Sequence, residues 1–391
     1  MAERIRQDGS LARGGWHGWR LRIAIVLLVG LAVVGIFWGA GRWREKSAEH
    51  RLAAIYAAHA LSAEENAATI YYQLLAADPQ VLLPAPAPGM PQDRSIAPAP
   101  VFSEEERITM LLDAAKRPRC YFPALCDSAA RAEAMGWTRS TAIARNGTMG
   151  RWAQSVLAAA FDDLEQGRLD AARQKLRCVA QMADHLRQQP AALDFVTAGT
   201  IESLFLPALA EFIVERDATD KHLAMIEEIL PSLADDWEAA SAEMRQVETM
   251  LDARSAWERL RFLINGRSPQ EVLEQCAQTY REKVCERRGV RILIELRRYK
   301  NRSGGWPETL DEIRAQLPPE ALADPLGSGE LVYELEPGGF RLYSMGPDHR
   351  KDSSLGDDHP LWPRRGILRW LQDRQWDTSQ AAGGQTTQRT R

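Results

Sequence analysis

The sequence lacks an excess of charge of either sign. Its 49 lysine and arginine residues stand against 53 aspartate and glutamate residues, which gives a formal net charge of -4. Proteins that bind nucleic acid normally carry a clustered basic excess, so this balance argues against a nucleic-acid partner. Hydrophobic residues make up 45% of the 391 residues, a share typical of globular proteins, and the length favours two or three folding units.

Signatures of enzymes are lacking as well. The chain holds no GxSxG elbow, SxxK, HExxH, Walker loop or GxGxxG motif. His185 and His222 fall near the ends of amphipathic stretches, where we expect solvated or capping imidazoles. Asp162 and Asp163 are neighbours on a predicted helix, so we expect diverging surface charges. We therefore predict no catalytic residue and no cofactor other than the calcium considered below.

Cysteine is scarce, with five residues, no CxxC and no paired histidines for zinc. Five residues separate Cys120 from Cys126 in a proline-punctuated stretch, so a disulfide between them is one interpretation in an oxidising compartment. Cys276 and Cys285 would lie over about 13 Å apart on one straight helix, too far to bridge. Two alternatives stay open: all five thiols are reduced and buried, or Arg119 makes Cys120 reactive.

One long hydrophobic run is present near the start of the sequence. Residues 23–41 contain nineteen residues without a charge, flanked by tryptophans on both sides, and roughly match the thickness of a bilayer. A cleavable signal peptide fits less well, because the run is too long. We predict a single transmembrane helix that contacts membrane lipid in the inner (cytoplasmic) membrane. The short basic tail is the natural cytoplasmic end, so the bulk of the chain is expected in the periplasm.

The rest of the chain predicts a mainly α protein. Residues 151–186 carry apolar positions at helical spacing on both sides of Gly167, which indicates two antiparallel helices similar to one tetratricopeptide (TPR) hairpin. Capping boxes at Ser62 and Ser103 predict two helix starts. The predicted units are a basic tail (1–22), the transmembrane helix (23–41), juxtamembrane helices (42–78), a proline-rich linker (79–102), a helical domain (103–303), a β-hairpin module (304–362), and a short helix with a disordered tail (363–391).

The C-terminal part differs in character from the helical part. Gly304 should end the last long helix, and residues 307–313 read as a short helix. The stretches ELVYEL and FRLYS alternate in polarity and flank Pro337-Gly338-Gly339, which predicts a hairpin with one face on the preceding helix.

Residues 306–358 are similar to the C-terminal half of type II secretion major pseudopilins, through Asp324-Pro325, the strand LVYEL and the stretch LYSMGPD. In those proteins the anchor and this module share one continuous helix, whereas about 260 residues intervene here. The resemblance implies a calcium loop that begins at Gly346-Pro347-Asp348. A solvated acidic loop is the alternative. The carboxylates of the predicted loop are Asp348, Asp352, Asp357 and Asp358.

A second resemblance covers nearly the whole chain. The stretches ENAATIYY, AAKRPRCYFP, residues 151–186 and RSGGWPETLDEI look like the successive signatures of a large set of uncharacterised, membrane-anchored bacterial proteins. We expect a non-catalytic binding or scaffolding platform in the cell envelope, with an unknown protein partner and a link to a secretion or pilus-like assembly. The alternative is a membrane-tethered hydrolase of unrecognised type, with a cleft between the helical body and the hairpin.

Overall fold

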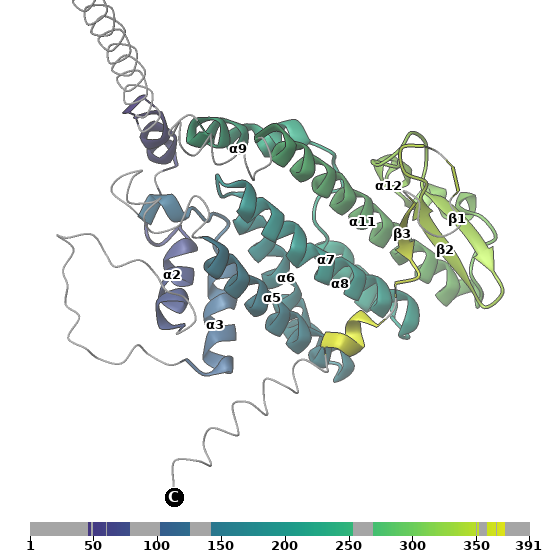
Figure 1. Cartoon of the computed structure of the whole chain (residues 1–391). Coiled ribbons are helices and arrows are strands. Elements are labelled where there is room, and N and C mark those ends of the chain that lie inside the picture. Colours follow the sequence, from purple (N-terminus) through teal and green to yellow (C-terminus); the bar gives the residue numbers. More distant parts are fainter. Residues whose placement is uncertain are drawn as a thin grey trace, which may run out of the picture.

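The computed structural model shows a mainly helical protein with one small antiparallel sheet (Figure 1). The mainly α prediction is confirmed. The basic tail, the predicted transmembrane helix, nearly all of the proline-rich linker and the polar tail lie outside the described residues. The structure describes residues 46–47, 50–59, 61–78, 102–125, 142–252, 269–348, 350–351, 358–364 and 366–371.

The helices pack as a bundle with the sheet at one end (Figure 1). Helices α5, α6 and α7 contact one another, α3 packs on α6, and α11 runs along α7 and α9 to reach the sheet. The helices are α2 (Ala68–Ala77), α3 (Glu104–Ala115), α5 (Ala142–Glu165), α6 (Leu169–Arg187), α7 (Ala192–Glu215), α8 (Asp220–Ile229), α9 (Trp237–Asp252), α11 (Pro269–Ser303) and α12 (Pro319–Leu322), with 3-10 turns η1 (Phe122–Leu125), η2 (Leu310–Glu312) and η3 (Arg314–Gln316).

One of the two predicted helix starts is where the sequence places it. Ser103 Oγ accepts the N–H of Glu106 at 3.2 Å, and Glu106 Oε2 accepts the N–H of Ser103 at 2.8 Å, which begins α3. Ser62 Oγ also accepts a backbone N–H, yet α2 begins only at Ala68. The start differs because Asn66 leaves the helical path and accepts the Ala68 N–H through Oδ1 at 3.0 Å.

Helices α5 and α6 form the helical hairpin that the spacing predicts. Gly167 in the turn has a φ of 72°, a left-handed conformation that glycine adopts without strain. The prediction for Asp163 was wrong, because its side chain is buried rather than a surface charge. Its carboxylate contacts Arg168 Nε at 2.8 Å and Lys175 Nζ at 2.6 Å, which offsets the cost of burying it.

Helix α7 runs through the bundle between α6 and α11. By length and composition it alone, among the described helices, could cross a membrane. However, 67% of its most apolar 18-residue stretch is buried inside the fold, as is typical of a helix in a protein core. Near its end, Glu211 Oε2 accepts the N–H groups of Ile367 at 2.8 Å and Leu368 at 3.2 Å. This carboxylate therefore caps the short C-terminal helix, residues 367–371.

Helix α11 is 35 residues long and connects the bundle to the sheet. Gly304, with a φ of 84°, ends it as predicted. Cys276 and Cys285 lie on this helix as buried, free thiols, in agreement with the helical spacing. Gly289 lets the sheet approach closely, since a Cβ at this position would lie 2.9 Å from Leu361 Cδ1.

The sheet has the strand order β1 (Val332–Glu336), β2 (Gly339–Ser344) and β3 (His359–Trp362). Strands β1 and β2 form the predicted antiparallel hairpin. The sequence did not predict β3, which pairs antiparallel with β2 and places Trp362 opposite Leu342. A proline within this four-residue strand removes the usual strand signal. Residues 307–313 also differ from the prediction, because they contain the single 3-10 turn η2 instead of an α-helix.

The residues that carry the pseudopilin resemblance hydrogen-bond to one another. Asp324 Oδ2 accepts the Ser344 hydroxyl at 2.7 Å, and Ser344 Oγ accepts the Gly346 N–H at 3.0 Å. Asp324 Oδ1 accepts the Leu326 N–H at 2.9 Å. These bonds join the loop before β1 to the end of β2 and fix the base of the acidic loop.

Candidate functional site

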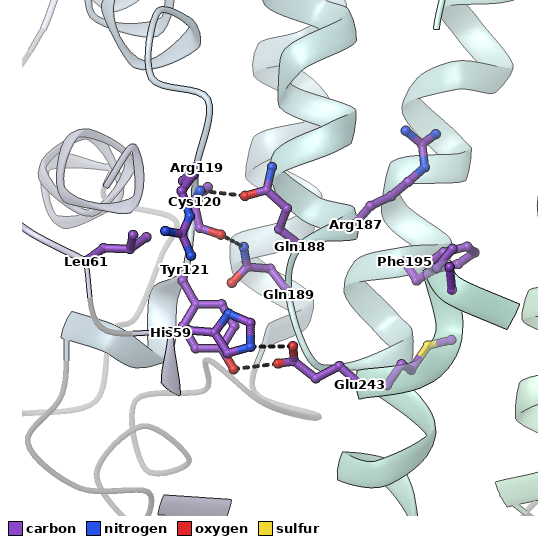
Figure 2. Close-up of a pocket in the computed structure, with 13 residues that line it drawn as sticks. His59, Leu61, Arg119, Cys120, Tyr121, Arg187, Gln188, Gln189, Phe195 and Glu243 are labelled. Atoms are coloured by element: carbon purple, nitrogen blue, oxygen red, sulfur yellow. Dashed lines mark hydrogen bonds and ion pairs between the residues drawn. The ribbon is translucent and has the colours of Figure 1, made fainter. Parts of the chain in front are cut away.

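A hollow of about 340 Å³ lies where distant parts of the chain meet (Figure 2). This volume is at the lower end of ligand pockets, which span roughly 300–1,000 Å³. In Figure 2, Arg119, Tyr121 and His59 lie on one side and Arg187 and Phe195 on the other. The lining residues come from the region after helix 50–58, the segment 119–121, the end of α6 and the starts of α7 and α9: His59, Leu61, Arg119, Cys120, Tyr121, Arg187, Gln188, Gln189, Phe195, Ala239, Ala240, Glu243 and Met244.

The segment 117–122 forms one wall of the hollow, and its backbone bonds go largely to side chains. Asn66 acts like a neighbouring strand: its Oδ1 accepts the N–H of Tyr121 at 2.9 Å, and its Nδ2 donates to the C=O of Tyr121 at 3.0 Å. The backbone N–H of Ala67 donates to the C=O of Arg119 at 2.9 Å. Buried backbone groups require such partners, so these bonds keep an irregular segment ordered.

Two glutamines at the end of α6 hold the same segment from the other side. Gln189 Oε1 accepts the N–H of Phe122 at 3.0 Å, and its Nε2 donates to the C=O of Cys120 at 2.7 Å. Gln188 Oε1 accepts the N–H of Cys120 at 2.8 Å, and its Nε2 donates to the C=O of Pro118 at 3.0 Å. Both amide ends of each glutamine are used, which leaves a wall with few free polar groups.

His185 lies beneath this wall and is fully buried, so the prediction of a solvated or capping imidazole was wrong. Its Nε2 lies 2.7 Å from the C=O of Arg117, and its Nδ1 lies 2.9 Å from the Tyr71 hydroxyl. A carbonyl only accepts, so Nε2 carries the proton and Nδ1 accepts from Tyr71. Burial lowers the pKa of His185 to about 4, partly opposed by its bond to the carbonyl, so the ring is neutral. His222, by contrast, caps α8 as predicted.

A histidine, a glutamate and a tyrosine meet at the floor of the hollow (Figure 2). His59 Nε2 lies 2.7 Å from Glu243 Oε2, and the Tyr121 hydroxyl donates to Glu243 Oε1 at 2.7 Å. The His59 ring stacks on the Tyr121 ring, with centroids 4.6 Å apart and planes inclined by 23°. Both carboxylate oxygens are engaged, and the imidazole is held in a single orientation.

The two arginines of the hollow differ in their partners. Arg187 is engaged by Asp184 at 2.8 Å and by the buried Glu202. Burial alone would raise the pKa of Glu202, but the guanidiniums of Arg187 and Arg287 lower it overall. Arg119 is exposed, and its guanidinium makes no hydrogen bond or ion pair with the residues that the structure describes. Arg119 is therefore the cation available to a ligand.

Cys120 contributes no exposed thiol to the hollow. Its side chain is buried, and burial raises the pKa of the thiol far above its usual range. This environment therefore does not favour a reactive Cys120 thiol activated by Arg119. Cys126 lies outside the described residues, so the disulfide between the two stays a prediction.

The predicted calcium loop is described only in part. Asp348 is exposed, and its Oδ1 accepts the N–H of Arg350 at 2.8 Å. Asp358 is half-buried, whereas Asp352 and Asp357 lie outside the described residues. Within the described ranges, no three histidine, cysteine, aspartate or glutamate side chains gather to hold a metal. The two described carboxylates do not by themselves fit the six to eight oxygens that calcium takes, so the loop stays a prediction.

Between the helical body and β3 there is a hole of about 10 Å³, lined by Leu361, Arg364 and residues of α7 and α11. Its one carboxylate, Glu286, contacts Lys283 Nζ and Arg364 Nη1, each at 2.7 Å. Burial alone would raise the pKa of Glu286, but a hydrogen bond with His359 and the two cations lower it to about 2. These ion pairs hold β3 against α11 and leave no room for a substrate.

The sequence did not point to His59, Glu243 or the two glutamines. Their side chains come from positions far apart in the chain, and none belongs to a motif of known chemistry. A usable signal was the stretch RPRCYFP. Its prolines exclude an α-helix and regular strand pairing, so the backbone N–H and C=O groups of this stretch need other hydrogen-bond partners. Comparison with protein-family models, with curated proteins and with solved structures gives no match for this chain.

Proposed function

We propose that this chain is an envelope protein, anchored by residues 23–41, whose helical body binds a partner at the hollow without catalysing a reaction. The observation that carries the proposal is the order of the hollow's walls. The amides of Gln188 and Gln189 are used by the backbone, and the Glu243 carboxylate is used by His59 and Tyr121. A preformed polar hollow lowers the entropic cost of ordering a ligand, which favours binding.

The location in this proposal depends on the nineteen-residue apolar run. Helix α7 is the other apolar segment of the right length, but the bundle buries most of it. We therefore assign the anchor to residues 23–41 and the body to the periplasm. The TPR-like shape of α5 and α6 and the pseudopilin-like module support a role next to a secretion or pilus-like assembly.

A membrane-tethered hydrolase is the second candidate, and the geometry favours it less. Its cleft was expected between the helical body and the hairpin, where the described residues leave a hole of about 10 Å³. In the larger hollow the Cys120 thiol is covered, and Glu243 is already bound by two donors. Neither place presents a nucleophile to a substrate among the residues that the structure describes.

Site-specific photocross-linking in bacterial cells tests the binding role. A photoreactive residue replaces Ala240, which lines the hollow on α9, or Ala224, an equally exposed alanine on α8 that serves as the control. We expect a discrete protein adduct from position 240 only, in a membrane fraction that resists carbonate extraction. Adducts of the same size from both positions, or none from either, contradict the proposal. Release of the chain into the soluble fraction contradicts the anchor.

A further inference from the structure

We infer that the hollow binds the carboxylate end of a partly apolar ligand, such as the C-terminal residue of a peptide, with the carboxylate on Arg119 and an N–H of the ligand on His59. The inference rests on the proposed binding role and adds the chemical class of the ligand.

Arg119 is fixed at its backbone and free at its guanidinium. The Arg119 C=O accepts the Ala67 N–H, and the next residue is held by the two glutamines of α6. Arg119 is a lining residue of the hollow, and its guanidinium has no partner among the described residues, whereas Arg187 across the hollow is paired with Asp184 and Glu202. A planar guanidinium with free donors matches a carboxylate bidentately.

His59 offers its second nitrogen to the same ligand. Glu243 can only accept, so Nε2 of His59 carries a proton, and Nδ1 has no partner among the described residues. Stacking on Tyr121 keeps the ring in this orientation. In this tautomer Nδ1 is a hydrogen-bond acceptor, so it can take an N–H of the ligand, such as the amide N–H of a C-terminal residue. Glu243 and Tyr121 contact this ring, and the other charged or titratable residues that line the hollow are Arg119, Cys120 and Arg187.

The charge of the hollow favours a single negative charge over two. Arg119 supplies the one guanidinium of the hollow without a partner among the described residues, while Glu243 contributes a negative charge at the floor. A phosphate monoester dianion would place its second charge near Glu243 without another free cation, because Arg187 is already engaged. A carboxylate avoids this repulsion.

The hollow also has apolar surface, and it is larger than a carboxylate needs. Leu61, Phe195, Ala239 and Met244 contribute apolar surface to it. An apolar side chain next to the carboxylate would lose its exposed surface there, which adds to binding. A peptide that ends in leucine combines both features.

Calorimetric titration of the full-length protein in detergent tests the inference. The probes are N-acetyl-alanyl-leucine, its C-terminal amide and phenyl phosphate. We expect saturable binding of the free acid, with affinity about tenfold lower for the amide and for Arg119→Met. Arg281→Met, an exposed arginine on α11 that makes no contact with the hollow, should bind like the wild type.

Three results would overturn the inference: equal binding of acid and amide, an unchanged Kd in Arg119→Met, or absence of saturable binding by the acid. Tighter binding of phenyl phosphate than of the acid would also refute the carboxylate assignment. Arg119 has no partner among the described residues to lose, so its replacement should leave folding intact, which the thermal melting midpoint checks. A cross-link from Ala240 without discrimination between acid and amide would leave the binding role in place and overturn only the ligand class.

Discussion

The buried imidazole of His185 should make folding sensitive to mild acid. Its Nε2 donates to the Arg117 C=O at 2.7 Å, and its Nδ1 accepts from Tyr71 at 2.9 Å, so the ring can take up a proton only at Nδ1, where it removes the acceptor of the Tyr71 hydroxyl. Burial lowers its pKa to about 4 from an ordinary value of 6.5. Because the folded pKa is the lower one, the stability is complete above the unfolded value and is lost as the pH falls toward about 4.

The magnitude follows from the two pKa values. At about pH 5 the unfolded imidazole is mostly protonated, while the folded one is mostly neutral. Proton linkage turns this difference into a loss of about 2 kcal/mol in the free energy of unfolding relative to pH 7. The loss approaches about 3 kcal/mol below pH 4 and then levels off.

Chemical denaturation of the full-length protein at about pH 7 and about pH 5 measures this loss directly. Other groups also titrate, so the informative quantity is the difference between the wild type and His185→Gln, whose amide can replace both hydrogen bonds without titrating. We expect the variant to lose about 2 kcal/mol less between the two pH values. His50→Gln, at an exposed histidine, is the control and should behave as the wild type. An equal loss in wild type and His185→Gln would refute the reasoning.

The remaining predictions concern the junction of bundle and sheet, and the acidic loop. The pKa of Glu286 is lowered in the folded protein, so its ion pairs stabilise the fold above about pH 4.5, and this stability is lost as the pH falls toward about 2. In denaturation experiments, Arg364→Met should therefore lose less free energy of unfolding between these pH values than the wild type. An equal loss in both proteins contradicts the ion pair. Gly289→Ala should lower the free energy of unfolding by about 1–3 kcal/mol, because the added methyl group overpacks against β3. Gly150→Ala on α5 is the control: it has open space around it and should stabilise the protein slightly. Equal effects of the two changes on the melting midpoint contradict this packing. Millimolar calcium should raise the melting midpoint and Asp348→Ala should abolish the rise, and a midpoint insensitive to calcium disposes of the site.

Features that depend on neighbours in the sequence were predictable. The α3 cap at Ser103, the turn at Gly167 and the end of α11 at Gly304 each need only residues within a few positions. The hairpin of β1 and β2 likewise follows from its turn and its alternation. Strand β3 was missed because the four residues of the strand include Pro360, and only pairing with β2 makes them a strand.

Burial of polar groups was not predictable, because it depends on partners far along the chain. Asp163 reads as a surface charge until Arg168 and Lys175 are seen to neutralise it. His185 lies on an amphipathic helix whose outer side is covered by a segment nearly 70 residues earlier in the sequence. In both cases the residue type predicted an exposed side chain, but specific hydrogen-bond or ion-pair partners made its burial possible.

The same turn of α6 connects the stability of the bundle to the shape of the hollow. His185, Gln188 and Gln189 all bind the segment 117–122, and they do so within five residues of one another. Protonation of His185 takes place at Nδ1 and removes the acceptor of the Tyr71 hydroxyl, whereas Nε2 keeps its bond to the Arg117 carbonyl. We therefore expect acid to weaken the contact between α2 and α6, while the bonds of His185 Nε2, Gln188 and Gln189 to the segment 117–122 stay in place.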